Sequence, residues 1–153
     1  MKLNQEIFAI KLYEMEQQYG KLQSRLHICG GEDQRKIRQE LKKAMDEYKE
    51  MAVLLQKNVE GSRSQAVTEL AQAQLDFSNK MRQLLQGQLA RYLHSEQSSP
   101  VEDQAEAMTL YAEYAIDFAT QAMKYALIAS LSAMELQLEA QEQTSKKRRD
   151  EKD

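Results

Sequence analysis

Residues that interrupt helices are scarce in this sequence, and their scarcity constrains the fold more than any other feature does. The chain has one proline and five glycines in 153 residues. A protein built from β-strands needs turn residues at spacings of roughly eight to twelve positions, and this chain does not supply them. Glu, Gln, Lys, Ala, Leu and Met, which all favour helices, are abundant. We therefore predict an all-α protein, an up-and-down bundle of four helices with short turns and coiled-coil-like packing.

The first two helices have clear signals at their ends. The first is predicted over 3–28, because Gly30 and Gly31 follow, and glycine ends a helix by taking the left-handed conformation at little cost. The second is predicted to begin near Asp33, whose carboxylate suits the positive end of the helix dipole. In the first helix, apolar residues at alternating steps of four and three predict a seam that faces another helix. This seam is Phe8, Leu12, Met15, Tyr19, Leu22, Leu26 and Cys29.

The boundary between the second and third helices is less sharp. Gly61 is predicted to close the second helix, and Ser62 with Gln65 has the pattern of a capping box that opens the third. The alternative is one continuous helix over 33–94, which would leave a bundle of three helices. Apolar residues continue through the boundary at helical spacing and keep this alternative open. They are Leu55, Val59, Ala66, Leu70, Ala73 and Phe77.

The start of the last helix has the strongest local signal in the chain. Ser99 is a good N-cap, Pro100 suits the first helical position, and Glu102 completes a capping box. We predict a helix that begins at Pro100 and continues past Leu138. The four helices are expected to form a single domain over 1–145, followed by a charged and disordered tail over 146–153.

The last helix contains the least ordinary stretch, Tyr111 to Met134. Its charged side chains are Glu113, Asp117 and Lys124. On a helix these charges occupy a narrow face, and the apolar arc covers roughly two-thirds of the circumference, more than a one-sided amphipathic helix needs. We predict that other helices contact this helix from more than one side. Two arrangements are open: it is the innermost helix of one chain's bundle, or it shares a face with a second copy.

One face of the last helix is a stripe of alanines, whose short side chains allow two helix axes to approach closely. The predicted close-packing seam is Ala112, Ala115, Ala119, Ala122, Ala126 and Ala129. Leucine at Ala119 or Ala122 is expected to overpack this contact. Leucine at Ala71, which we place on the outer face of the third helix, is expected to matter little.

A second face of the last helix is predicted to bind another copy of the chain. The helix is longer than the first, so its far half should extend beyond the rest of one bundle. Large exposed apolar patches are unusual on monomers, and a two-fold dimer is the commonest homo-oligomer. The candidate interface of this homodimer is Leu127, Leu131, Met134 and Leu138.

No catalytic, cofactor or metal site is predicted. Neither His27 nor His94 has a glutamate three residues before it, as helical di-iron sites require. The single cysteine, Cys29, ends an apolar seam and is interpreted as a small buried group. No phosphate-binding loop or nucleophile motif occurs. We therefore expect a non-enzymatic interaction protein that acts through helix–helix contacts, as an adaptor, a chaperone-like binder or an assembly subunit.

Two alternatives follow from other clusters. The candidate basic cluster Lys146, Lys147, Arg148 and Arg149, with the basic residues of the second helix, could contact nucleic acid. We expect no nucleic acid partner, because the formal net charge is −3 and acidic residues follow at once. The aromatic residues Tyr111, Tyr114, Phe118 and Tyr125 could line a small-molecule cavity. Without a signal-peptide pattern or a long apolar run, we expect a cytoplasmic protein with no membrane contact.

Overall fold

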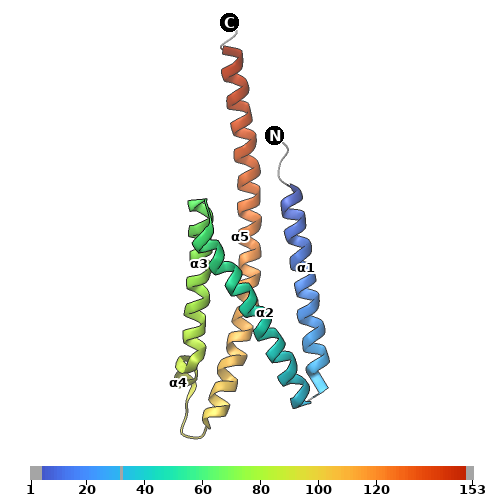
Figure 1. Cartoon of the computed structure of the whole chain (residues 1–153), viewed down its shortest axis with the longest axis vertical. Coiled ribbons are helices and arrows are strands. Elements are labelled where there is room, and N and C mark those ends of the chain that lie inside the picture. Colours follow the sequence, from blue (N-terminus) through green and yellow to red (C-terminus); the bar gives the residue numbers. More distant parts are fainter. Residues whose placement is uncertain (1–4, 32, 151–153) are drawn as a thin grey trace. The chain divides into compact units, whose positions relative to one another are not determined.

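The computed structural model describes residues 5–31 and 33–150, and every regular element in these ranges is a helix (Figure 1). The elements are α1 (Gln5–Ile28), a 3₁₀ turn (Cys29–Gly31), α2 (Gln34–Gly61), α3 (Gln65–Gln83), a π-helical turn (Leu84–Gln88), α4 (Leu89–Leu93) and α5 (Pro100–Asp150). Helices pack on helices, since α2 contacts α3 and α4 contacts α5. The predicted all-α class is therefore confirmed.

Local chemistry sets the ends of the first two helices largely as the sequence predicts. α1 ends just before the glycine pair, and Asp33 caps α2 by accepting hydrogen bonds from the backbone N–H groups of Arg35 and Lys36, at 3.0 and 3.3 Å. α2 ends at Gly61, and a turn separates it from α3. The alternative of one continuous helix over 33–94 is therefore wrong.

The N-cap of α3 lies two residues later than predicted. Ser64, and not Ser62, caps the helix, with its hydroxyl accepting from the backbone N–H of Val67 at 3.5 Å. Ser62 instead accepts a hydrogen bond from the N–H of Ser64 at 3.2 Å and stabilises the turn. Serine suits both roles, so the sequence does not distinguish the two positions.

The predicted capping box at the start of α5 is confirmed. The backbone N–H of Ser99 donates to Oε2 of Glu102 at 2.7 Å, and the N–H of Glu102 donates to the Ser99 hydroxyl at 3.3 Å. The hydrogen bond from the Ser99 backbone, and then the Ser99 hydroxyl, hold the pKa of the Glu102 carboxyl below its ordinary value. The box satisfies two N–H groups that would otherwise lack a partner.

A break inside the third helix was not predicted. The helix changes direction at the π-helical turn, where Gly87 has φ 107°, a left-handed conformation that glycine adopts without strain. The chain also divides close to this turn into two compact units. One is Glu6–Gln88, and the other contains the described residues from Leu89 onward. The single domain predicted over 1–145 stays a prediction.

In the unit of Glu6–Gln88, α2 and α3 pack against each other beside the turn that joins them (Figure 1). Ala71 on α3 is buried, with 7% of its surface exposed, so its predicted place on the outer face is wrong. The positions expected to face a neighbour, Leu70 and Phe77, are instead 74% and 49% exposed. A small residue occupies the buried position because helices approach most closely where side chains are short.

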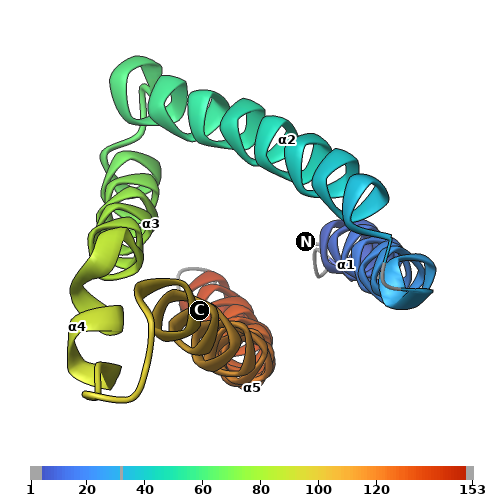
Figure 2. The same cartoon turned by 90° about the horizontal axis from the view of Figure 1, so that it is seen from below.

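Within this unit, an arginine of α1 contacts α2. The Arg25 guanidinium reaches α2, where Nε lies 2.9 Å from Oε2 of Glu40 and Nη1 lies 2.7 Å from Oε2 of Glu47. Away from this contact α1 and α2 diverge (Figures 1 and 2). They leave an open groove of about 1370 Å³, lined in part by Tyr19, Tyr48 and Met51.

In the other unit, α4 covers only the first turns of α5. Ala107 is fully buried and Asp103 is 4% exposed, whereas α5 continues to Asp150. A helix of 51 residues is roughly 77 Å long, against roughly 8 Å for the five residues of α4. The basic cluster 146–149, predicted to be part of a disordered tail, is helical here, and residues 151–153 lie outside the described residues.

Candidate interaction surface

The far part of α5 presents the predicted interface as one exposed stripe. Leu127, Leu131 and Leu138 are 61%, 56% and 52% exposed, and Met134 is half-buried. The four residues follow one another at steps of four, three and four, so they lie on one face of the helix. Because α4 contacts α5 only near Asp103 and Ala107, no element of the same unit covers this stripe. Whether it binds a second copy stays a prediction.

The alanine stripe lies on an adjoining face of the same helix. Five of its six members are exposed, and Ala115 is half-buried. The stripe is therefore accessible to a second helix, and the close contact predicted for it stays a prediction. The residues that α4 does bury, Asp103 and Ala107, lie outside both stripes.

The α1 helix presents another apolar face. Its predicted seam is largely exposed, with Leu12 at 58%, Tyr19 at 60% and Leu26 at 64%. Arg25, which connects α1 to α2, lies beside this seam and was not singled out in the sequence. The signal was weak, because an arginine among many exposed charges looks the same whether or not it links two helices.

The aromatic residues of α5 do not enclose a cavity in this structure. The rings of Tyr114 and Phe118 lie 6.2 Å apart at 55°, a tilted contact that is common between aromatic side chains. Tyr114, Phe118 and Tyr125 are 54%, 38% and 63% exposed. Such rings belong to an open surface that suits a protein partner better than an enclosed small molecule.

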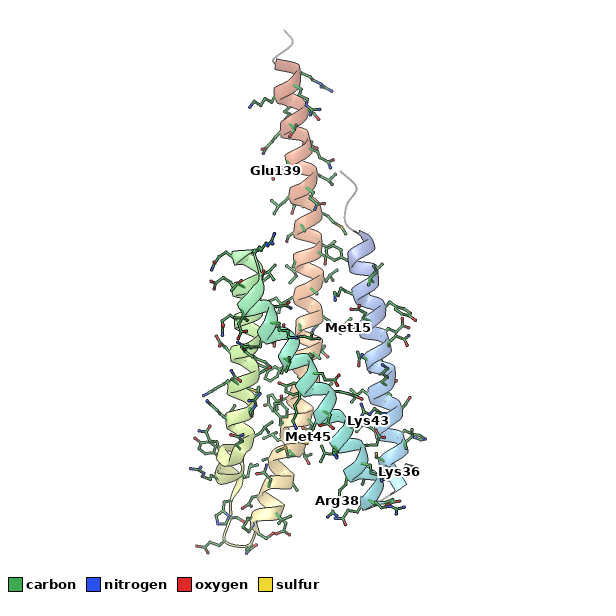
Figure 3. The ribbon with its side chains drawn as sticks, in the orientation of Figure 1. Met15, Lys36, Arg38, Lys43, Met45 and Glu139 are labelled. Carbon is green, nitrogen blue, oxygen red and sulfur yellow. The ribbon has the colours of Figure 1, made fainter. Side chains whose placement is uncertain are left out.

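The basic clusters lie on exposed helix surfaces. Lys147, Arg148 and Arg149 occupy the last turn of α5, where cations are favourable against the helix dipole, and Lys146 directly precedes that turn. Lys36, Arg38 and Lys43 lie on the half of α2 that follows the turn from α1 (Figure 3). Acidic residues such as Asp46 and Glu50 alternate with them along the helix, so the positive charge does not form a continuous stripe.

A polar cluster joins α4 to α5. Nδ1 of His94 lies 2.7 Å from Oδ2 of Asp103, and the Asp103 side chain is 6% exposed. The Ser98 hydroxyl, and then the hydrogen bond to His94, hold the pKa of the Asp103 carboxyl below its ordinary value. This pair was not predicted from the sequence. The available signal was that His94 at a helix end and Asp103 in the first turn of the next helix flank the same short loop.

Asp103→Asn is expected to change how stability depends on pH. The pKa of Asp103 is lower in the folded chain than in the unfolded chain. Its carboxylate therefore stabilises the fold above about pH 4, and this contribution is lost as the pH falls through the lower folded pKa. Urea unfolding across acidic pH should show a shallower acid limb for Asp103→Asn than for the wild type. A control, Glu113→Gln, removes an exposed carboxylate of the same helix. Equal acid limbs for the wild type and Asp103→Asn would contradict the assignment.

Among residues 5–31 and 33–150, no three histidine, cysteine or acidic side chains come together as metal ligands. In the same part of the chain, no helix combines the length and apolar character needed to cross a membrane. No protein-family model matches the sequence, and neither a curated protein nor a solved structure is significantly similar to it.

Proposed function

We propose that this chain is a non-enzymatic cytoplasmic protein that binds other proteins through apolar helix faces, as an adaptor, a chaperone-like binder or an assembly subunit. One observation carries the proposal. Among the described residues, only Ala71 and Ala107 are buried apolar side chains, whereas large apolar side chains on α1, α2, α3 and α5 are exposed. Contiguous apolar surface of this kind typically marks an interaction site.

The regular spacing of the exposed residues supports a helical partner. Along α1 the exposed seam Leu12, Tyr19 and Leu26 repeats every seven residues. On α5 the exposed Leu127 and the half-buried Met134 are also seven residues apart. A seven-residue repeat keeps one face toward a second helix along its whole length. A helix from another protein can therefore bury these faces without any change in the fold of the chain.

Affinity capture from the native host, with the whole chain as bait, tests the proposal. We expect a specific protein to co-elute with the wild type and to be lost with Leu12→Glu, which places a charge in the α1 seam. The matched control is Ile10→Glu, because Ile10 is 60% exposed and Leu12 is 58% exposed, but the two point to different sides of α1.

Other outcomes of the same experiment would replace the proposal. Nucleic acid that co-elutes and is released by salt would favour binding through the basic clusters. A co-purified small molecule would favour a ligand-binding bundle. Equal capture by the wild type, Leu12→Glu and Ile10→Glu would show that the α1 seam is not the binding face.

A further inference from the structure

We propose that α5 pairs with α5 of a second copy as an antiparallel coiled coil, with Leu127, Leu131, Met134 and Leu138 as its apolar core. The inference rests on the proposed function in one respect, since it identifies one partner of the exposed helix faces as this chain itself. It adds the orientation of the two helices and the alignment of their residues, and both can be tested directly.

The heptad pattern around the four core residues is regular. Continued at steps of three and four in both directions, it includes Asp117, Thr120, Lys124, Gln141, Ser145 and Arg148. Four of the ten positions in this pattern are apolar, and they span Leu127 to Leu138, so the apolar core is shorter than the three to four apolar heptads of a long coiled coil. Along this length α5 is an unbroken helix, and no element of its unit covers the stripe.

The spacing of the core residues is symmetric. Leu127 and Leu138 are equally far from the midpoint between residues 132 and 133, and so are Leu131 and Met134. A two-fold axis at this midpoint places Leu127 against Leu138 of the second copy and Leu131 against Met134 of the second copy. All four apolar layers are then filled by apolar side chains from both helices, as a self-complementary interface requires.

Charges beyond the core select the antiparallel orientation. The same axis brings Asp117 opposite Arg148 of the second copy, and Lys124 opposite Gln141 with Glu142 beside it. In a parallel pair, Asp117, Lys124 and Arg148 would each lie opposite the identical residue of the second copy. Like charges at such short distance are unfavourable, whereas opposite charges set the orientation of helix pairs.

Of the two hydroxyl residues that enter the pattern, Thr120 is compatible with burial. Thr120 lies opposite Ser145 of the second copy, and its hydroxyl already donates to the backbone carbonyl of Ile116 at 3.1 Å. A hydroxyl that is hydrogen-bonded within its own helix can be covered without the cost of an unsatisfied donor. The layers beyond Leu127 and Leu138 are therefore polar, and the apolar core has four layers. The polar layers do not disfavour the pairing.

Sedimentation equilibrium with the whole chain tests whether the pair forms. Across a hundredfold range of concentration, we expect the wild type to move from a mass near 17.7 kDa toward twice that mass. Leu131→Glu should remain near 17.7 kDa, because it buries a charge in the core. Leu136→Glu is the matched control, since Leu136 is 62% exposed but lies on the opposite side of α5. Helix content measured by circular dichroism confirms that each variant folds.

Cysteine cross-linking tests the orientation. In a Cys29→Ser background, which removes the only native cysteine, Leu127→Cys and Leu138→Cys are made in separate chains. In the antiparallel pair, two copies of Cys at 127 are offset by eleven positions, about 16 Å along the axis, too far for a disulfide. We therefore expect mixed disulfides when the two variants are combined, and few when either is oxidised alone.

The outcomes separate this inference from the proposed function. A wild type that stays near 17.7 kDa throughout, or equal behaviour of Leu131→Glu and Leu136→Glu, overturns the α5 pair. Disulfides formed by Leu127→Cys alone overturn its antiparallel orientation. None of these results depends on capture of a host protein through α1, so the proposed function can stand when the dimer fails, and the reverse also holds.

Discussion

Ala107→Leu is expected to lower the free energy of unfolding by roughly 1–3 kcal/mol, because it overpacks the contact between α4 and α5. Ala107 is the most deeply buried apolar residue described, with 0% of its surface exposed. Five residues of α4 have little freedom to move aside while His94 and Asp103 hold the same two helices together. Urea unfolding followed by circular dichroism measures the change.

The control for this variant lies two residues earlier on the same helix. Ala105 is exposed, so Ala105→Leu adds the same side chain without a clash, and leucine is nearly as good a helix former as alanine. If both variants unfold at the same urea concentration as the wild type, α4 does not pack on α5 in solution as it does here.

Ala71→Leu is expected to have an effect of similar size, roughly 1–3 kcal/mol, in the other unit. Ala71 is 7% exposed where α3 packs on α2, and half-buried side chains such as Leu55 and Val59 on α2 flank the turn beside this contact. An added isobutyl group must push the helices apart or take a strained rotamer. The measurement is again the urea concentration at which half the chains are unfolded.

Ala73→Leu separates this interpretation from the one based on sequence alone. The sequence places Ala73 in the buried seam and Ala71 outside it, and the structure reverses the two, since Ala73 is exposed. A larger loss of stability for Ala73→Leu than for Ala71→Leu would mean that α3 turns its other face toward its neighbour.

The length of α5 that α4 does not contact is the physical reason to expect an α5 pair. From residue 112 to residue 150, roughly 58 Å of helix extends beyond the part that α4 contacts. Isolated helices gain little stability in water, and most helical stability comes from burial of an apolar face. The proposed pairing with a second copy would supply that burial along the core Leu127–Leu138 and would bring the basic last turn to the acidic Asp117.

Short-range chemistry was readable from the sequence. The glycine pair Gly30–Gly31, the cap at Asp33 and the box of Ser99 and Glu102 each act between residues at most three positions apart, so the residues that form the signal also satisfy it. The sequence therefore determined the all-α class, the end of α1 and the first residue of α5, whereas it left the separation of α2 from α3 open. The sequence predicted the wrong N-cap for α3, Ser62 instead of Ser64, because both serines lie within one turn and either can cap a helix.

Only the tertiary structure decided which helix faces are covered. Ala71 is buried because α2 crosses α3 there, and Ala107 and Asp103 are buried because α4 folds back onto α5. The turn at Gly87 depends on a left-handed conformation that glycine permits but does not require. Apolar periodicity shows that a helix has a face to bury, whereas the identity of the neighbour depends on contacts between residues far apart in the chain, which local spacing does not encode.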